Sequence, residues 1–437
     1  MQDTVQALRR GDLAGARSLR LTGALAALPR EVFGLSDTLE MLDLSGSGLS
    51  ALPDDMGRLR KLRILFCSGT RFARLPPCLG DCPALSQIGF RGSGLREVPA
   101  ESLPNALRWL TLTDNRIEAL PEALGARPQL QKLMLAGNRL RALPASLAGA
   151  PNLELLRLSA NRFEDLPAWL AELPSLAWIA WGGNPLAGAA RAPARAPEVA
   201  WSHLEPGALL GEGASGRVHR ALWRKGGTGA GQAVALKLFK GSLTSDGLPE
   251  HEMAACLAAG RHPHLTGALG RVTGHPEGVD GLLMPLLPPG WRPLAGPPSL
   301  ASCSRDVYDP DLRLDPRAAL RIARAVAEAA AHLHAGGILH GDLYAHNILW
   351  DGVAGEAVLS DFGAASGLPA GVAGTALERI EVRAWGLLLG ELLDRCAREP
   401  EAATALRALE RACCQADPRA RPRMAEIRAQ VGAGSTG

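Results

Sequence analysis

The stretch HGDLYAHNIL, residues 340–349, contains two side chains whose types and spacing could carry out chemistry. The carboxylate of Asp342 is a candidate general base, because it can accept a proton from a reacting hydroxyl group. The amide oxygen of Asn347, five residues later, is a candidate ligand for a divalent cation. A base beside a metal ligand is a pairing that phosphoryl transfer to a hydroxyl group uses.

A second group of candidates lies upstream in LLGEGASGRVHRA, where Gly211, Gly213 and Gly216 are followed by Val218. A lone G-x-G-x-x-G motif also occurs in dinucleotide-binding folds and as a plain glycine turn, so both alternatives stay open on this motif alone. The segments that follow, RVHRALW and QAVALKLF, have the composition of strands, whereas a dinucleotide-binding motif continues into a helix. We therefore favour a glycine hairpin that covers phosphate groups.

Lys237 lies in VALK, on the second of these strand-like segments. A lysine in so apolar a strand needs an anionic partner, because burying an unpaired charge is costly. Phosphate oxygens and a glutamate on a nearby helix would both serve. We predict that Glu252, in EHEMAACLAAG, is this glutamate, and we consider Glu250 the weaker candidate.

The elements around the catalytic stretch complete an ordered set of motifs. A long alanine-rich helix, RAALRIARAVAEAAAHLHAGG, precedes the loop, and Asp361 follows Asp342 by nineteen residues in VLSDFGAAS. Each motif is common by itself, but the sequence of glycine loop, strand lysine, helix glutamate, Asp-x4-Asn and Asp-Phe-Gly is not. With this set, residues 203–432 resemble a eukaryotic-type protein kinase domain, which implies a two-lobed α+β fold.

The resemblance implies a role for each matching residue. Asp342 would accept the proton of the attacking hydroxyl group, and Lys237, held by Glu252, would contact the α- and β-phosphates of ATP. Asn347 and Asp361 would hold Mg²⁺. The residues implied to bind the nucleotide are Leu210, Gly211, Gly213, Gly216, Val218, Ala235, Lys237, Met284 and Leu286.

Two residues of the loop depart from the family pattern. Gly341 stands where an arginine usually contacts an activation-loop phosphate, so we expect no control by phosphorylation of that loop. Tyr344 stands where serine/threonine kinases have a lysine near the γ-phosphate, and its absence could slow transfer by about 10²–10³-fold. Partial compensation by His346, if protonated, or by Arg217 is the weaker alternative.

The segment after Asp361 is also short, because Glu378 follows it by only seventeen positions. The long hydrophobic helix of the family normally begins more than ten residues further on. We therefore expect much of the platform that docks a substrate peptide to be missing from this chain. Arg421, in DPRARPRMAEI, matches the family arginine that pairs with this glutamate, so we predict a buried Glu378–Arg421 ion pair.

The N-terminal part of the chain, up to residue 187, is repetitive. Asn115, Asn138, Asn161 and Asn184 recur at one constant interval, inside the template seen in LQKLMLAGNRLRALP. The pattern L-x-x-L-x-L-x-x-N-x-L occurs in seven full copies and a truncated eighth and resembles leucine-rich repeats. The whole chain resembles cytosolic leucine-rich repeat protein kinases, which implies an α/β horseshoe solenoid followed by the kinase domain.

Side chains next to the inward strand leucines should face the concave side of such a solenoid, because strand side chains alternate between two faces. Large residues on that face indicate a protein or peptide partner, although they could also pack on neighbours or on the second domain. The residues predicted to bind a partner are Trp109, Lys132, Met134, Leu155, Arg157 and Trp178.

The bulk composition excludes several classes of protein. A net charge of +3 is too small to indicate nucleic-acid binding by electrostatics. No uncharged apolar stretch is long enough to cross a bilayer, and the first residues lack the features of a signal peptide, so we expect a cytoplasmic chain without a membrane span. The eight cysteines form no CxxC pair, so we expect reduced thiols.

These observations favour a leucine-rich repeat domain at 1–187, a linker at 188–202, a kinase domain at 203–432 and a flexible tail at 433–437. The leading hypothesis is an ATP- and Mg²⁺-dependent serine/threonine protein kinase that acts in signalling, on a partner recruited by the repeats or on itself. The alternative is a pseudokinase scaffold that binds nucleotide and acts through protein–protein interaction. The sequence leaves the oligomeric state open.

Overall fold

The computed structural model describes residues 2–186, 197–227, 230–241, 243–399 and 402–433. The chain divides into two compact units, Met1–Ser175 and Leu176–Gly437. The truncated eighth repeat therefore clusters with the second unit, a little before the predicted boundary. Most of the predicted linker and nearly all of the predicted tail lie outside the described residues, and the predicted domain boundaries remain proposals.

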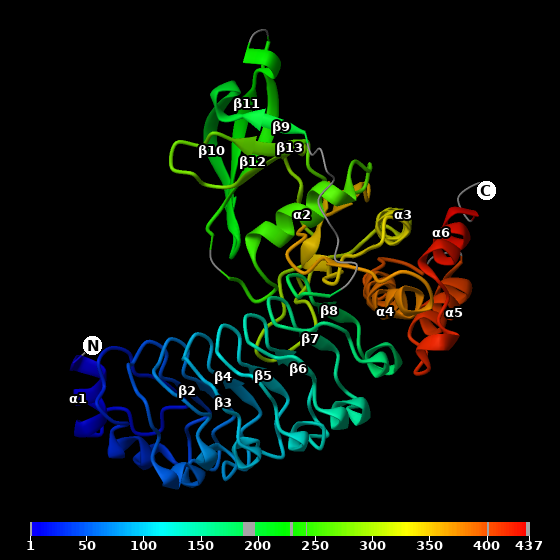
Figure 1. Cartoon of the computed structure of the whole chain (residues 1–437). Helices are drawn as coiled ribbons and strands as arrows, with labels where there is room; N and C mark the ends of the chain where they lie inside the picture. Colours follow the sequence, from blue (N-terminus) through cyan, green and yellow to red (C-terminus); the bar gives the residue numbers. More distant parts are fainter. Residues whose placement is uncertain (1, 187–196, 228–229, 242, 400–401, 434–437) are drawn as a thin grey trace. The chain divides into compact units, whose positions relative to one another are not determined.

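The first unit begins with a short helix and continues as a parallel sheet of three-residue strands in sequence order (Figure 1). The strands pair in register, so that Leu65 lies beside Leu42 and Ile88 beside Leu65. These central residues are buried because no single repeat can bury its own leucines without its neighbours. The bounds are α1 Gln2–Arg10, β1 Ser18–Arg20, β2 Met41–Asp43, β3 Ile64–Phe66, β4 Gln87–Gly89, β5 Trp109–Thr111, β6 Lys132–Met134 and β7 Leu155–Arg157.

Each repeat returns through a 3-10 turn that starts directly after a proline. Pro53 and Pro76, for example, precede such turns with extended backbone, since the proline ring fixes φ near −65°. The turns span Arg30–Leu35, Asp54–Arg58, Pro77–Leu79, Ala100–Ser102, Glu122–Leu124, Ala145–Gly149 and Ala168–Glu172.

The repeated asparagines form a ladder of buried hydrogen bonds along this unit. The side chain of Asn138 accepts from the backbone N–H of Ile117 at 3.1 Å and donates to the carbonyls of Leu112 and Leu135 at 2.9 Å each. Asn161 makes the equivalent bonds one repeat later. Each asparagine therefore satisfies backbone groups that the turn leaves without partners.

Replacing Asn138 with alanine should lower the free energy of unfolding by about 1–3 kcal/mol, because the buried N–H of Ile117 loses its acceptor. The carbonyls of Leu112 and Leu135 each lose one donor but keep the bond from Asn115 or Asn161. Asn152→Ala is the matched control, since the amide of Asn152 is exposed and, among the described residues, donates one bond, to the carbonyl of Pro128. Urea denaturation followed by circular dichroism measures both variants. Equal losses in the two would show that the ladder does not contribute as described.

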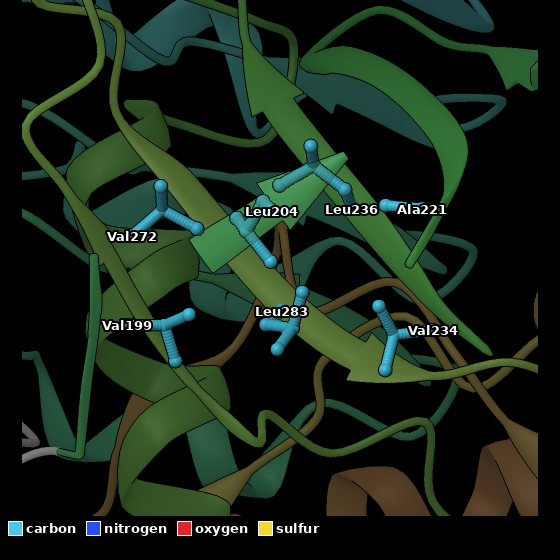
Figure 2. Close-up of a cluster of buried hydrophobic side chains, with 7 residues drawn as sticks. All are labelled: Val199, Leu204, Ala221, Val234, Leu236, Val272 and Leu283. Carbon is cyan, nitrogen blue, oxygen red and sulfur yellow. The ribbon is translucent and has the colours of Figure 1, made fainter. Parts of the chain in front are cut away.

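The second unit contains a six-stranded sheet in the order β10-β11-β12-β14-β13-β9, with helix α2 beside it. Val234 and Leu236 of β12 point into a buried cluster with Leu283, which Figure 2 shows together with Val199, Leu204, Ala221 and Val272. Because side chains alternate along a strand, the residues between them face the opposite side. The bounds are β9 Glu198–Ala200, β10 Leu204–Glu212, β11 Gly216–Trp223, β12 Gln232–Phe239, α2 Pro249–Ala259, β13 Gly270–Thr273 and β14 Gly281–Pro285, with 3-10 turns at Trp201–His203 and Lys225–Gly227.

The rest of this unit is mainly helical, with two small sheets (Figure 1). Helix α3 begins at Pro316, where the side chain of Asp315 accepts from the backbone N–H of Arg317. Its many buried alanines allow α4 and α6 to pack closely against it. The bounds are β8 Trp178–Ala180, β15 Arg292–Pro293, α3 Pro316–Ala335, β16 Ile338–Leu339, β17 Ile348–Trp350, β18 Ala357–Leu359, β19 Ser366–Gly367, α4 Val372–Leu393, α5 Ala403–Cys413 and α6 Met424–Ala433, with 3-10 turns at Ala345–Asn347 and Pro418–Ala420.

The predicted fold class is confirmed: parallel repeats are followed by a mixed α+β domain. All eight cysteines are free thiols, and six of them are buried, as expected from the sequence. Among the described residues, no helix has both the length and the apolar character needed to cross a membrane.

Candidate functional site

The glycine motif forms the hairpin between β10 and β11, as predicted. The backbone N–H of Gly213 donates to the carbonyl of Gly216 at 2.9 Å, which closes the turn. Lys240 holds the hairpin from outside, since its Nζ donates to the carbonyl of Gly213 at 2.8 Å and lies 2.8 Å from Glu212. No helix follows Gly216, and the dinucleotide-binding alternative is therefore excluded.

The strand register places four predicted site residues on one face of the sheet. Val218 pairs with Lys237, and Ala235 pairs with Met284. Residues opposite one another share a face, and Ala235 and Lys237 are two apart on one strand, so the four side chains lie together. This face is opposite to the buried cluster of Figure 2, which holds the strands in place.

Leu210 and Leu286, at the edges of this face, are less enclosed. Leu210 is 52% exposed on β10, and Leu286 is half-buried just after β14. An exposed leucine in a glycine hairpin offers apolar surface to a flat ligand, but the described chain itself does not cover it.

Lys237 forms an ion pair with Glu252 of α2, as predicted from the sequence. The two side chains are only 13% and 5% exposed. Burial raises the pKa of Glu252 above its ordinary value, although the ammonium group of Lys237 acts in the opposite direction. The negative charge of Asp361 adds to the increase. The carboxylates of Asp361 and Glu252 both lie beside Gly363, where a Cβ atom would be 3.2 Å from Oδ1 of Asp361 and 3.9 Å from Oε2 of Glu252.

Asp342 and Asn347 are joined by direct hydrogen bonds. The side-chain Nδ2 of Asn347 donates to Oδ2 of Asp342 at 2.8 Å and to its backbone carbonyl at 2.9 Å. The asparagine is buried and the aspartate is half-buried, so the loop is held from within while the carboxylate still reaches solvent. Because Nδ2 makes both bonds, Oδ1 is the atom of Asn347 that suits a cation.

Asp361 has an unusual backbone conformation. Its φ angle is 62°, which a residue with a side chain adopts at a cost of about 1–3 kcal/mol. Its Oδ1 accepts the backbone N–H of Gly363 at 3.0 Å, and the residue is exposed. Strain of this kind is tolerated where it aims a side chain, and here it presents a carboxylate to solvent beside the Lys237–Glu252 pair.

His346 is paired with Asp306, a residue for which the sequence predicted no role. Nδ1 of His346 lies 2.7 Å from Oδ1 of Asp306, whose side chain is 1% exposed. Burial is the largest single influence and works to lower the pKa of His346. The hydrogen bond to Asp306 and the negative charges of Asp342, Asp306 and Asp361 together outweigh it, and the pKa rises. Asp306 is 40 residues away in a segment with no regular pattern, so no signal in the sequence could have indicated it.

Glu381 of α4 holds the backbone at the start of the catalytic stretch in place. Its carboxylate accepts the backbone N–H of Gly341 at 2.7 Å and also contacts Nε2 of His334 at 2.7 Å. Burial by itself would raise the pKa of Glu381, but the hydrogen bonds with His334 and Gly341 and the electrostatic influence of His334 and His340 lower it below the ordinary value. A charged anchor at 1% exposure thus fixes the start of the loop.

Comparisons with known families agree with this geometry. The model of the protein tyrosine and serine/threonine kinase family matches residues 204–372. The leucine-rich repeat model matches residues 105–163 and 128–186. The chain combines leucine-rich repeats with a protein kinase domain. A search of curated proteins finds no match to the chain.

The kinase match ends at residue 372, where α4 begins. Only eight residues separate Gly363 from that helix, and Glu378, expected at the end of the activation segment, lies inside it. The kinase domain therefore has a shortened activation segment that runs almost directly into α4.

The predicted Glu378–Arg421 ion pair of the kinase domain is wrong. Glu378 pairs with Arg423, whose Nη2 lies 3.3 Å from its carboxylate. Arg421 donates instead to the carbonyls of Gln415 and Arg379, at 2.9 and 3.1 Å. Burial lowers the pKa of Arg421 to about 10. The buried guanidinium group of Arg421 therefore donates to backbone carbonyl groups, whereas the sequence predicted a carboxylate as its partner.

The residues predicted to bind a partner differ in exposure. Trp109 and Met134 are half-buried, and the ammonium group of Lys132 lies 4.1 Å from the centroid of the Trp109 ring. Trp178 does not fit the prediction, because its ring stacks on Tyr344 in the kinase domain of its own chain. The buried members of the predicted set are Lys132, Leu155, Arg157 and Trp178.

Proposed function

We propose that this protein is an active kinase that transfers the γ-phosphate of ATP to serine or threonine hydroxyl groups. The observation that carries the proposal is that all five groups needed for the reaction are present in mutually supporting positions. Lys237 is paired with Glu252, Asp342 is bonded to Asn347, and Asp361 is exposed beside the first pair.

The residues present fit a magnesium nucleotide. Asp361 and Asn347 offer the hard oxygen atoms that Mg²⁺ prefers, and Lys237 offers the cation that phosphate oxygens require. The apolar face around Ala235 and Val218 suits an adenine ring. Bound Mg²⁺ would neutralise charge that develops on the phosphate groups.

The remaining chemistry falls to side chains of the catalytic loop. The oxygen of the substrate hydroxyl group attacks the γ-phosphorus atom, and ADP leaves. Asp342 accepts the proton of that hydroxyl group. The Nδ2 group of Asn347 donates to Oδ2 of Asp342 and so fixes the orientation of the carboxylate that accepts the proton. Catalysis depends mainly on positioning and on neutralising charge, so no covalent step on the protein is needed.

Transfer should be slow, since no lysine follows Asp342 in the loop. The two cations considered as substitutes are already engaged: Arg217 lies 3.3 Å from Glu212, and His346 is hydrogen-bonded to Asp306. The absence of one electrostatic contact near the γ-phosphate costs about 10²–10³-fold in rate.

We further propose that the repeats bring the substrate protein to this site in the cytoplasm. Half-buried Trp109 and Met134, beside the cationic Lys132, form an amphipathic surface on the strand face of the first unit. Aromatic and long flexible side chains of this kind are common at sites that bind peptides. The kinase itself is the alternative substrate.

The test is incorporation of labelled phosphate. Purified full-length protein is incubated with Mg²⁺ and γ-labelled ATP, with and without a generic Ser/Thr substrate, and compared with Asp361→Asn. We expect slow incorporation by the natural chain and about 10²–10³-fold less by the variant, which loses a metal ligand. Equal incorporation in both would refute the assignment, and analysis of the labelled residues would decide between Ser/Thr and Tyr.

One observation favours a second candidate function, a pseudokinase scaffold. Tyr344, in the position of the missing lysine, is buried under Trp178 and cannot contact a phosphate group in this conformation. A scaffold would show an increase in melting temperature with Mg-ATP but no transfer over several hours. Transfer by the natural chain, lost in Asp361→Asn, would exclude it.

A further inference from the structure

The last repeat strand, β8, belongs to the same compact unit as the kinase domain. It contacts α4 and the catalytic loop, and Trp181, directly after the strand, contacts the segment that follows Asp361. These contacts join segments about 165 residues apart in sequence. Nothing in the proposed reaction assigns them a role.

The first contact is made by Trp178. Its ring is stacked on Tyr344 with 4.1 Å between centroids and 8° between planes. Its Nε1 donates to the carbonyl of Leu343 at 3.0 Å, and the guanidinium group of Arg305 lies 5.1 Å from its ring centroid. Trp178 therefore holds both the backbone and a side chain of the loop directly after Asp342.

The second contact is made by Trp181. Its backbone N–H donates to Oγ of Ser366 at 2.9 Å, and its indole Nε1 donates to the carbonyl of Gly367 at 3.1 Å. Ser366 and Gly367 form β19, which pairs with β16 next to the catalytic loop. Asn184 closes the turn below by donating to the carbonyl of Trp181 at 2.8 Å. The repeat is thus hydrogen-bonded to the segment that a kinase must order.

Gly341 allows this close approach. Its φ angle is +75°, and a Cβ atom there would lie 2.3 Å from the carbonyl oxygen of Ile179 and 2.8 Å from that of Ala364. No side chain fits between β8 and the loop. The arginine expected at this position from the family would have to displace the repeat strand.

We propose that residues 176–186 serve as a built-in activation segment, in which Trp178 and Trp181 are positioning residues that keep the catalytic loop ordered without phosphorylation. The proposal rests on the proposed kinase function. It accounts together for the shortened segment after Asp361, the glycine at 341 and the aromatic residue at 344. The contacts of Trp178 and Trp181 leave the reacting groups accessible to solvent, since Asp342 is half-buried and Asp361 is exposed.

The test compares Trp178→Ala and Trp178→Phe in the full-length protein, with Trp169→Ala as the matched control. Trp169 is a half-buried tryptophan in the 3-10 turn Ala168–Glu172 of the first unit, and it has no role in the site. Steady-state kinetics gives kcat and the KM for ATP. Hydrogen exchange gives the protection of backbone amides in residues 341–347 and 363–367, and far-UV circular dichroism checks folding.

We expect Trp178→Ala to lower kcat by about tenfold or more with a KM for ATP within about twofold, since displacing a catalytic group by about 1 Å costs up to 10²-fold. Amides 341–347 should lose protection in the same variant. Trp178→Phe keeps the stacked ring and should stay within about threefold of the natural kcat. The control should match the natural protein in both measurements.

An unchanged kcat with unchanged exchange would overturn the proposal, and so would a rise in kcat, which would mean that Trp178 obstructs the site. Should Trp178→Ala fail to fold, Trp181→Phe replaces it: the lost bond to Gly367 should expose amides 363–367 to exchange. If the natural protein transfers no phosphate, the kinase function fails by itself. The exchange data then decide separately whether the repeat orders the loop.

Discussion

Asp342→Asn is expected to reduce phosphate transfer by about 10²–10⁴-fold, the contribution of a positioned general base. Asparagine has the same shape as aspartate, and its Oδ1 can still accept the 2.8 Å bond from Asn347, but it cannot accept a proton. Nucleotide binding should persist, because Lys237 and Glu252 lie on other elements. Initial rates with labelled ATP measure the first effect, and the increase in melting temperature with Mg-ATP measures the second.

Asp309→Asn is the matched control for this experiment. The carboxylate of Asp309 is exposed and, within the part of the chain that the structure describes, accepts only the backbone N–H of Asp311, at 2.9 Å. The transfer rate of Asp309→Asn should therefore equal that of the natural chain. A natural rate in Asp342→Asn would place the proton acceptor elsewhere. Loss of the ATP-induced stabilisation in Asp342→Asn would mean that the variant disturbs the fold and that its rate says nothing about the base.

The second large effect is on stability. Glu381→Ala should lower the free energy of unfolding by about 3–5 kcal/mol, the cost of removing one partner from a buried charged network. The variant leaves the backbone N–H of Gly341 and the imidazole of His334 buried without their acceptor. Glu381→Gln should lose less, because its amide oxygen can still accept from Gly341. Urea denaturation measures both, and exposed Glu399→Ala, expected to change stability by less than about 0.5 kcal/mol, is the control.

The pKa of Glu381 also determines the sign of the pH dependence. Because its pKa is lower in the folded protein than in the unfolded chain, its ionised carboxylate stabilises the fold at any pH above the ordinary glutamate value. That contribution is lost as the pH falls through the lowered pKa. The stability difference between the natural chain and Glu381→Ala should therefore shrink in acid. A difference that stays constant down to strongly acidic pH would contradict the charged anchor.

Local patterns predicted most of the architecture. The constant interval between Asn115, Asn138 and Asn161 predicted both the solenoid and the register of its strands, because every repeat must bury the same positions against its neighbours. The Lys237–Glu252 pair could also be predicted from the sequence. A lysine in an apolar strand requires a buried anion, and the following helix offers few carboxylates.

Other features depended on how the chain turns in space. Arg421 and Arg423 are two residues apart, and the sequence does not tell which of them reaches Glu378. The backbone before α6 buries Arg421 among carbonyl groups and directs Arg423 to the carboxylate. The pairing of His346 with Asp306 is similar, because Asp306 lies in an irregular segment that only tertiary packing brings to the loop.

The sequence by itself determined the order of the domains and the repeat register, and it predicted the candidate residues for phosphate transfer, because these depend on short spacings within single elements. Tertiary structure alone decided which contacts Gly341, Tyr344 and Trp178 make. From the sequence, Gly341 and Tyr344 stand where the kinase family has an arginine and a lysine, and Trp178 is predicted to bind a partner protein. In the folded chain they form one contact, since stacking and hydrogen bonds between segments about 165 residues apart have no local signature in the sequence.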